Sequence, residues 1–249
     1  MEYRIDQRSE VDSTNEVVKR ALEGGEPEGF VCRARVQTGG YGRQGRAWSS
    51  PEGGLYQSLL LRPKVPMAQL PTLALAVALA VREAVLSASG AVDSSVQVKW
   101  PNDVMAPIEG AWGKLSGISC ETHAGGVCVG IGVNVLRPHA IQPAAGKNIP
   151  VYLADFQEAA SERTIGQLGD IILESFSNRY DLWQCKGFSA FADEFARCSL
   201  LTGKRVRIAD LAGTITAEGT ATGIDEEGRL LVQTDVATVA VSSGEAHLQ

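Results

Sequence analysis

The last stretch of the chain has a different texture from everything before it. From Lys204 to Gln249, about 46 residues form short alternating runs that Gly and Asp interrupt, and no run has helical spacing. Small strands of this kind are typical of a five-stranded barrel of the SH3 type. Upstream, helical and strand patterns alternate. The sequence therefore predicts an α+β domain over residues 1–200 and a small β domain over residues 201–249.

The composition is that of an ordinary globular protein, and it argues against several functional classes. The chain has 249 residues, of which 44% are hydrophobic and 21% charged, and its formal net charge is −6. A negative net charge argues against general binding to duplex nucleic acid. The most apolar run, Leu73 to Val81, is far shorter than the roughly 20 residues that cross a bilayer, and the charged N-terminus is no signal peptide. Five cysteines without a CxxC pair suit reduced thiols, so we expect a cytoplasmic protein. From the charge and the short apolar run we expect no nucleic-acid or membrane partner.

Apolar spacing predicts the elements of the α+β domain. Ser13 with Glu16 three residues later is the pattern of a capping box at the start of a helix. Pro101 ends a strand and leaves Asn102 and Asp103 on the loop that follows. The expected elements are strands over 29–38, 53–63 and 95–100, helices over 67–89 and 164–201, a hairpin over 113–135 with its turn near 124–126, and a loop over 137–150.

A segment rich in glycine and arginine interrupts the α+β domain. Residues 33–46 contain four arginines, four glycines and no acidic residue, and we call residues 39–46 the Arg-Gly loop. Glycine leaves backbone N–H groups open to a ligand, and Arg43 and Arg46 add forked donors that suit phosphate or carboxylate oxygens. A flexible surface turn would explain the same composition. The segment is neither a Walker loop nor a GxGxxG motif that precedes a helix.

Further segments carry polar residues where a ligand could meet them. Thr14 and Asn15 stand at a predicted helix N-terminus, Lys114 stands at a strand start, and Asn134 interrupts an apolar strand. Each also has an ordinary structural explanation: a helix cap, a solvated lysine, or an asparagine that satisfies backbone groups. A buried asparagine without partners would cost roughly 1–3 kcal/mol, so Asn134 must find some. Taken alone, the Pro-Asn-Asp sequence at 101–103 is ordinary turn chemistry.

The order of these segments resembles one family. The series DSTN, Gln37 with GxGRxGRxW, KWPND, GKLxGI and GIGxN, followed by a small β tail, is similar to biotin protein ligase from Val11 to the C-terminus. No winged helix-turn-helix precedes DSTN, so the chain resembles the short form without an N-terminal DNA-binding domain. The resemblance implies an α+β fold, with a mixed-sheet catalytic domain of the class II synthetase-like biotin/lipoate ligase type and an SH3-like β-barrel after it.

The same resemblance implies an adenylate-forming enzyme, a biotin–[acetyl-CoA-carboxylase] ligase, acting as a monomer or a homodimer. Its family makes biotinyl-5′-AMP from biotin and ATP, releases pyrophosphate, and passes biotin to one lysine of the biotin carboxyl carrier protein domain of a biotin-dependent carboxylase. Mg²⁺ would accompany ATP, held largely by phosphates and water rather than by protein ligands. A basic loop on an acidic protein would then offset the repulsion between a carboxylate and the α-phosphate that it attacks.

The resemblance also assigns site residues. Lys114, which would stabilise developing negative charge, and Arg43 are the expected catalytic residues. Biotin is expected to contact Ser13, Thr14, Asn15, Gln37, Gly40, Tyr41, Gly42, Arg43, Lys114 and Gly117. ATP and the adenylate are expected to contact Arg43, Arg46, Trp48, Asn102, Lys114 and Asn134. Asp103 would help to activate the carrier lysine or, as we favour, hold its loop, and Lys99 matches the motif without an assigned contact.

Two departures from the family pattern bear on the site. Tyr41 stands where the family usually has arginine, so the adenylate would be retained less tightly if that guanidinium normally holds it. The tyrosine ring could instead pack over biotin. Ser119 and Cys120 make one strand end more polar than a wall for biotin should be. We also expect the Arg-Gly loop to be disordered without ligand and to order over the adenylate.

Two other functions are compatible with the pattern. A lipoate or octanoate ligase shares the catalytic fold and also transfers an acyl group to lysine, but Ser13, Thr14 and the C-terminal β domain favour biotin. The second is a non-catalytic biotin-sensing protein on the same fold, and Tyr41 is the feature that gives this alternative weight.

Overall fold

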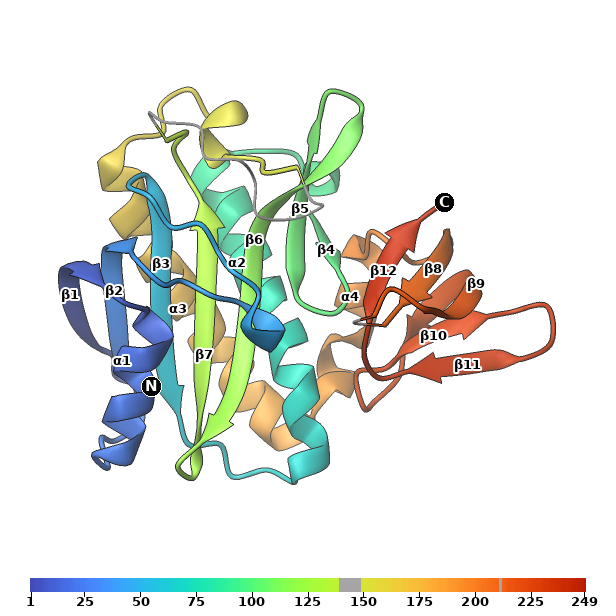
Figure 1. Cartoon of the computed structure of the whole chain (residues 1–249), viewed down its shortest axis with the longest axis horizontal. Helices are drawn as coiled ribbons and strands as arrows, with labels where there is room; N and C mark the ends of the chain where they lie inside the picture. Colours follow the sequence, from blue (N-terminus) through green and yellow to red (C-terminus); the bar gives the residue numbers. More distant parts are fainter. Residues whose placement is uncertain (139–148, 211) are drawn as a thin grey trace.

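The computed structural model describes residues 1–138, 149–210 and 212–249, so most of the loop expected over 137–150 lies outside the described residues. Two sheets organise the chain (Figure 1). The first contains β1 (Arg4–Val11), β2 (Phe30–Gln37), β3 (Gly54–Leu61), β4 (Gln97–Lys99), β5 (Asp103–Ile108), β6 (Ala111–His123) and β7 (Gly126–Asn134). Their order is β1-β2-β3-β7-β6-β5-β4. β1 and β2 are parallel, and the other neighbouring pairs are antiparallel.

Helices cover both faces of the seven-stranded sheet. α1 (Thr14–Glu23) lies on one face against β2, β3 and β7, and α2 (Leu73–Ser89) and α3 (Glu162–Lys186) lie on the other (Figure 1). Successive residues of a strand point to opposite faces, so β3 is buried along its whole length. Its Leu59 and Leu61 belong to the main core with α2 and α3, whereas Leu60 packs under α1. Burial on both faces explains why apolar residues dominate this strand, apart from the buried polar pair Gln57 and Ser58 at its centre.

The most apolar helix is an internal one. Residues 67–89 are long and apolar enough to cross a membrane by length and composition, with a mean hydropathy of 1.6, yet 67% of that apolar window is buried inside the protein. We expected one helix over this range, but the α-helix begins at Leu73, after a 3₁₀ turn over Met67–Thr72 that contains Pro71. Gly90 ends the helix as expected, in the left-handed conformation (φ 63°).

The expected hairpin is confirmed and lies near the centre of the sheet. β6 and β7 pair along their length and are joined at Ala124 and Gly125, whose positive φ angles of 43° and 73° are typical of a two-residue hairpin turn. Lys114 lies inside β6 rather than ahead of the strand. The strand expected over 95–100 is shorter, because β4 pairs with β5 only over Gln97–Lys99.

Other expectations were wrong, each for a physical reason. β1 escaped prediction because it is an edge strand with mostly exposed side chains and no apolar alternation. β5 escaped prediction too, and Asp103, expected on a loop, is its first residue and pairs with Gly117 of β6. Ser13 stands at the N-cap of α1 but makes no side-chain capping bond, while Glu16 accepts a hydrogen bond from Tyr41. The expected capping box is therefore absent.

A glycine divides the helical region that we expected to run from residue 164 to about residue 201. α3 ends at Lys186, and Gly187 has φ 68° and ψ −164°, a conformation that essentially only glycine adopts. A 3₁₀ turn and then α4 (Ala192–Cys198) follow. Buried phenylalanines continue the apolar spacing across the break, so periodicity alone could not reveal it.

The C-terminal residues form a five-stranded antiparallel sheet, which confirms the expected β domain. Its strands are β8 (Arg205–Ala209), β9 (Ile215–Ile224), β10 (Leu230–Gln233), β11 (Thr238–Val241) and β12 (Glu245–Leu248), in the order β11-β10-β9-β8-β12. The Trp100 indole N–H donates to the Gly228 carbonyl in the turn before β10 (2.9 Å). The Leu200 N–H donates to the Val98 carbonyl of β4 (2.8 Å). The Trp100 bond joins the second domain to the residue after β4, and the Leu200 bond ties the segment that precedes the second domain to β4 itself.

Replacing Gly187 with alanine is expected to lower the free energy of unfolding by about 1–3 kcal/mol, because a Cβ is strained at this φ and ψ. The matched control is Gly166→Ala within α3, where an added Cβ meets open space. That change is expected to raise the free energy of unfolding by about 0.5–1 kcal/mol, since glycine costs backbone entropy in a helix. Urea unfolding measures both values. Equal effects of the two substitutions would contradict the role of Gly187 as the break.

Candidate active site

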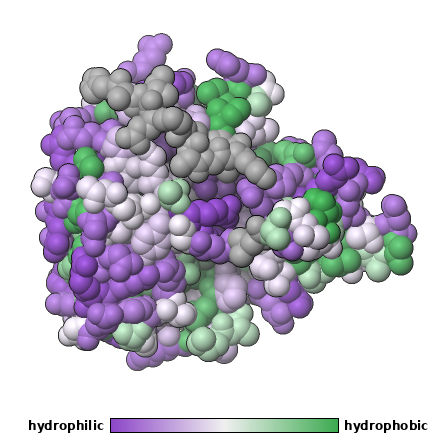
Figure 2. All heavy atoms as spheres, in the orientation of Figure 1, coloured by the Kyte–Doolittle hydropathy of each residue, from purple (hydrophilic) through white to green (hydrophobic). Residues whose placement is uncertain are grey.

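A cleft of about 780 Å³ lies between the first sheet and the C-terminal domain. The Arg-Gly loop crosses in front of β7 and β6 (Figure 1), and hydrophilic residues gather where the two domains meet (Figure 2). The expected site residues that line the cleft are Thr14, Asn15, Gln37, Tyr41, Gly42, Arg43, Arg46, Trp48, Asn102, Lys114, Gly117 and Asn134, together with Lys99 and Asp103. The fold thus collects at one place residues that are far apart in the sequence.

Two expected site residues, both in the described part of the chain, do not line this cleft. Ser13 is 2% exposed, and its carbonyl accepts the Val17 N–H in the first turn of α1. Gly40 packs against Ser50 and Trp48, because an added Cβ would lie 2.5 Å from Ser50 Oγ and 2.8 Å from the Trp48 carbonyl. A direct contact of either residue with biotin stays a prediction.

The floor of the cleft is built from glycine. Gly130 and Gly132 alternate along β7, and Gly117 of β6 lies directly opposite Gly132. A Cβ on Gly132 would come within 2.7 Å of the Trp48 indole, and one on Gly130 would clash with the Asn15 side chain. The glycines therefore leave room for these side chains and for a ligand. Gly130 and Gly132 were missed as site residues, although their alternation in GIGVN is a signal that the sequence carries.

One end of the cleft is a buried polar pocket. Gln37 Oε1 accepts from the Thr14 N–H (2.8 Å) and from Thr14 Oγ1 (3.0 Å). Ser58 Oγ lies 2.7 Å from Thr14 Oγ1 and 2.6 Å from Asn15 Oδ1, and Asn15 Nδ2 donates to Ser119 Oγ at 3.2 Å. Ser58 was missed, and Ser119 was noted only for its polarity. Ser58 follows Gln57 in a strand whose other residues are apolar or glycine, which is a signal that could have found it, whereas β6 contains so many polar residues that Ser119 does not stand out.

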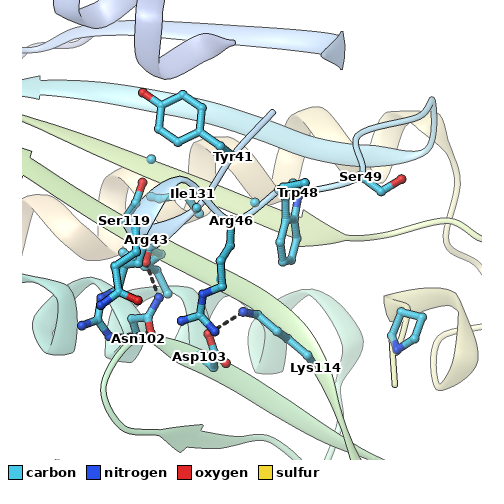
Figure 3. A pocket seen from close by; sticks show the side chains of 18 of the residues that line it. Tyr41, Arg43, Arg46, Trp48, Ser49, Asn102, Asp103, Lys114, Ser119 and Ile131 are labelled. Atoms are coloured by element: carbon cyan, nitrogen blue, oxygen red, sulfur yellow. Dashed lines mark hydrogen bonds and ion pairs between the residues drawn. The ribbon is translucent and has the colours of Figure 1, made fainter. Parts of the chain in front are cut away.

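The other end of the cleft gathers cations with their partners. Lys114 Nζ lies 2.7 Å from Asp103 Oδ1 and 5.2 Å from the centre of the Trp48 ring. Arg43 Nη1 donates to Asn102 Oδ1 (3.3 Å), and both contacts are visible in Figure 3. Each cation is thus held near the floor by an acceptor from the β4–β5 region. The arrangement presents several cationic donors to one volume.

The C-terminal domain and local burial modify these charges. Arg46 Nη1 lies 3.5 Å from Glu245 Oε2 at the start of β12. Burial lowers the pKa of Lys99. Burial first, and then repulsion from Arg46, lowers the pKa of Arg43. Cations that are partly removed from water gain more from an approaching anion than exposed cations do. This end of the cleft therefore favours a ligand with carboxylate or phosphate oxygens.

The backbone of Lys114 is fixed from two sides. Its N–H donates to the Ile149 carbonyl (2.7 Å), and its own carbonyl accepts from the Val151 N–H (3.0 Å) and from Asn134 Nδ2 (3.1 Å). On the other side the pairing with β5 shifts register at Met105, and such irregularities re-aim side chains. Asn134 thus satisfies a backbone group and also lines the cleft, and its contact with a ligand stays a prediction.

The Arg-Gly loop forms a small hairpin over the cleft. Tyr41 pairs with Ala47 across its base, and the Gly42 N–H donates to the Arg46 carbonyl (2.8 Å). The tip is a 3₁₀ turn over Arg43–Gly45. This geometry brings both arginines of the loop to the cleft. The expected ordering of the loop by ligand stays a prediction.

Comparisons with known proteins give matches to the same kind of protein in both domains of the chain. Residues 8–136 match the model of the Biotin/lipoate A/B protein ligase family, and residues 201–248 match that of the Biotin protein ligase C terminal domain. The chain is 33% identical to the Biotin–[acetyl-CoA-carboxylase] ligase of Mycobacterium tuberculosis, over 99% of this chain and 90% of that protein. It is also 33% identical to the Bifunctional ligase/repressor BirA of Bacillus spizizenii, over 96% of this chain and 72% of that protein.

A solved structure shows the same arrangement of elements. Biotin protein ligase from Aquifex aeolicus in complex with biotin and ATP superposes with a TM-score of 0.83 and 31% identity, covering 99% of this chain and 98% of that one. The family matches cover both domains that form the cleft. The chain therefore belongs to the biotin/lipoate A/B protein ligase family, and its C-terminal domain groups it with the biotin protein ligases.

Proposed function

We propose that this chain activates biotin with ATP, which forms biotinyl-5′-AMP and releases pyrophosphate, and that it then transfers biotin to a lysine of the carrier protein of acetyl-CoA carboxylase. One observation carries the proposal: a single cleft joins a buried polar pocket around Asn15 to a group of cations around Lys114. Biotin has a polar ureido ring at one end and a carboxylate at the other. It therefore matches the two ends of the cleft.

In the first step a biotin carboxylate oxygen bonds to the α-phosphorus of ATP, and the bond to pyrophosphate breaks. We propose that Lys114 and Arg43 stabilise the charge that accumulates when these anions meet, with Arg46 assisting from the loop. Lys114 and Arg43 already point donors at Asp103 and Asn102. Bound oxygens would replace or share these acceptors, so little reorganisation accompanies the reaction.

In the second step the neutral amine of the carrier lysine attacks the acyl carbonyl, AMP leaves with the electron pair of the broken bond, and the proton that the amine loses passes to the departing phosphate or to water. Asp103 is a candidate base, but its carboxylate lies 2.7 Å from Lys114 Nζ. We therefore propose that Asp103 holds Lys114 in position. The Arg-Gly loop would keep water from the mixed anhydride until the carrier arrives.

Trp48 is the residue against which we propose that adenine lies. Its indole N–H has no hydrogen-bond partner in the part of the chain that the structure describes, and its ring stands over Gly132. Asn102 and Asn134 line the same cleft and would contact the nucleotide. The described residues contain no group of three His, Cys, Asp or Glu side chains that could hold a metal, so Mg²⁺ would bind with ATP through phosphate and water oxygens.

The partner that we propose is the biotin carboxyl carrier protein domain of the carboxylase. We place the boundary between the two domains near residue 200, and Asp210 and Glu245 of the second domain line the cleft, so this domain would complete the active site. A net charge of −6 supports action without nucleic acid. The free cysteines support a cytoplasmic location, and we propose that the chain acts there as a monomer or a homodimer.

The polar pocket argues against the alternative functions. The ring of lipoate and the tail of octanoate lack the N–H and C=O groups with which a ureido ring would meet Thr14 and Asn15, so burying polar groups against them is unfavourable. A biotin sensor without catalysis was suggested by Tyr41 alone. In Figure 3 the Tyr41 side chain points away from Arg46, Asp103 and Lys114, so the cationic group is assembled without it.

The acid substrate is tested by ATP–pyrophosphate exchange measured with biotin and, separately, with lipoate. Exchange is expected with biotin, because its ureido ring can hydrogen-bond in the polar pocket, and exchange near background is expected with lipoate. Labelled biotin should then pass to a purified carrier domain in the same reaction mixture. Exchange with lipoate and none with biotin would overturn the assignment.

Replacing Lys114 with alanine is expected to slow adenylate formation by at least about 100-fold, because it removes a preorganised cation from the site of charge development. The matched control is Lys64→Ala, since Lys64 is exposed and does not line the cleft. Single-turnover formation of labelled biotinyl-AMP measures the rate, and thermal unfolding checks that both variants are folded. A wild-type rate in Lys114→Ala would remove Lys114 from this role.

Ordering of the Arg-Gly loop by substrates is tested by limited digestion with trypsin. Biotin and ATP together are expected to slow cleavage after Arg43 and Arg46, because the loop would close on the adenylate. Arg229, whose side chain is 40% exposed in the turn before β10, provides an internal control. If the substrates leave cleavage of the loop unchanged relative to cleavage at Arg229, the loop is not ordered by them.

A further inference from the structure

The Tyr41 hydroxyl contacts α1 rather than the cations of the cleft. Its O–H donates to Glu16 Oε1 (2.6 Å), and its oxygen accepts from Lys19 Nζ (2.7 Å). The Lys19 ammonium also lies 5.2 Å from the centre of the Tyr41 ring. Burial and the bond to Glu16 raise the pKa of Tyr41 to about 12, so the donated proton is retained at neutral pH. Tyr41 is thus attached to the helix by a donated and an accepted hydrogen bond.

Lys19 extends this contact to the sheet. Its ammonium has three N–H donors, and three acceptors surround it: the Tyr41 hydroxyl, Glu16 Oε1 at 3.3 Å and Glu121 Oε2 of β6 at 2.6 Å. The side chain is 18% exposed. Burial tends to lower the pKa of Lys19, but the bonds to Glu121 and Tyr41 outweigh it and raise the pKa. Lys19 therefore joins the loop, α1 and β6 as a permanent cation.

Glu121 continues the connection into the polar pocket. Its Oε1 accepts from Asn15 Nδ2 (3.3 Å), while its Oε2 holds Lys19. Asn15 is the residue that also bonds Ser119 on the floor of the pocket. A continuous series of contacts therefore runs from Tyr41 through Lys19 and Glu121 to Asn15.

The position of Tyr41 in the loop determines what this attachment restrains. Tyr41 is the first residue of the hairpin, where it pairs with Ala47, and the next residue, Gly42, bonds the Arg46 carbonyl. Arg43 and Arg46 both lie in the segment between Tyr41 and Ala47. The hairpin cannot lift its arginines from the cleft as one body without pulling the Tyr41 hydroxyl from Glu16 and Lys19.

We propose that Tyr41 is a positioning residue that fastens the Arg-Gly loop to α1, so that its hydroxyl contacts with Glu16 and Lys19 slow the opening of the loop and the escape of the bound acyl-adenylate. The inference rests on the proposed function and deepens it by naming the residue that sets how long the intermediate is retained. Tyr41 acts through the loop and touches neither reacting atom.

The test is the release of biotinyl-AMP from Tyr41→Phe, which removes the hydroxyl and leaves the ring. The matched control is Tyr3→Phe, because the Tyr3 hydroxyl also donates one bond, to the Leu173 carbonyl (2.9 Å), and accepts one, from Ser177 Oγ (2.9 Å), away from the cleft. Each protein is loaded with labelled biotin and ATP, freed of excess substrate, and chased with unlabelled biotin and ATP. Urea unfolding of both variants compares their stability.

Release from Tyr41→Phe is expected to be at least about tenfold faster than from the wild type, because the variant loses both charge-assisted hydrogen bonds of the hydroxyl. Release from Tyr3→Phe is expected to match the wild type. Unchanged release from Tyr41→Phe, or equal acceleration in both variants, would overturn the inference. If the wild type forms no labelled adenylate, the proposed function fails and the inference fails with it, whereas a wild-type adenylate with unaltered release overturns the inference alone.

A double substitution separates this attachment from a general loosening of the protein. Lys19→Met is expected to speed release as Tyr41→Phe does, since it removes the partner of the same hydroxyl. Because both substitutions remove the bond between Lys19 and the Tyr41 hydroxyl, the acceleration in the double variant is expected to be smaller than the product of the two single accelerations. Independent, multiplying effects of the two substitutions would overturn the inference.

Discussion

The active site depends on the unequal covering of the two faces of the seven-stranded sheet by helices. α2 and α3 cover one face of the central strands and bury their apolar side chains, whereas α1 covers only part of the other face. Along β7 this second face passes from Cys128, buried under α1, to Gly130 and Gly132 on the floor of the cleft. A sheet that is packed on one side and lined with glycine on the other can position polar groups rigidly and still leave space for a ligand.

Charge is distributed to suit that space. The chain carries a net charge of −6, yet Arg43, Arg46, Lys99 and Lys114 meet at one end of the cleft. Like charges in a partly dry site repel one another, and burial lowers the pKa of Lys99 and of Arg43. Acceptors from other elements, above all Asp103, offset this cost and hold the donors in place. The negatively charged oxygens of a substrate would reduce the same repulsion between cations, so the fold favours an anionic ligand.

Much of the architecture could be predicted from the sequence, and the exceptions share a cause. Turn residues near 124–126 separate the two strands of the β6–β7 hairpin, and the five-stranded second domain has regular turn residues, so both were predicted correctly. β1 is an exposed edge strand without a buried face, and the α3–α4 region keeps helical spacing through Gly187, so neither leaves a periodic signal of its true structure. Apolar periodicity in the sequence reflects which side chains are buried. It therefore cannot reveal an exposed strand, or a break within a run that stays buried.

The sequence by itself determined the chemical repertoire: which residues can donate to oxyanions, where glycine permits close approach, and which segments must be buried. Only the tertiary structure decided which of them meet. In the sequence Glu16 forms a capping-box pattern with Ser13, but in the fold it accepts a hydrogen bond from Tyr41. Ser58 joins the polar pocket although no motif marks it. The reason is physical: hydrogen bonds and ion pairs act over a few ångströms, and distances of that order between remote segments are set by how the helices pack on the sheet.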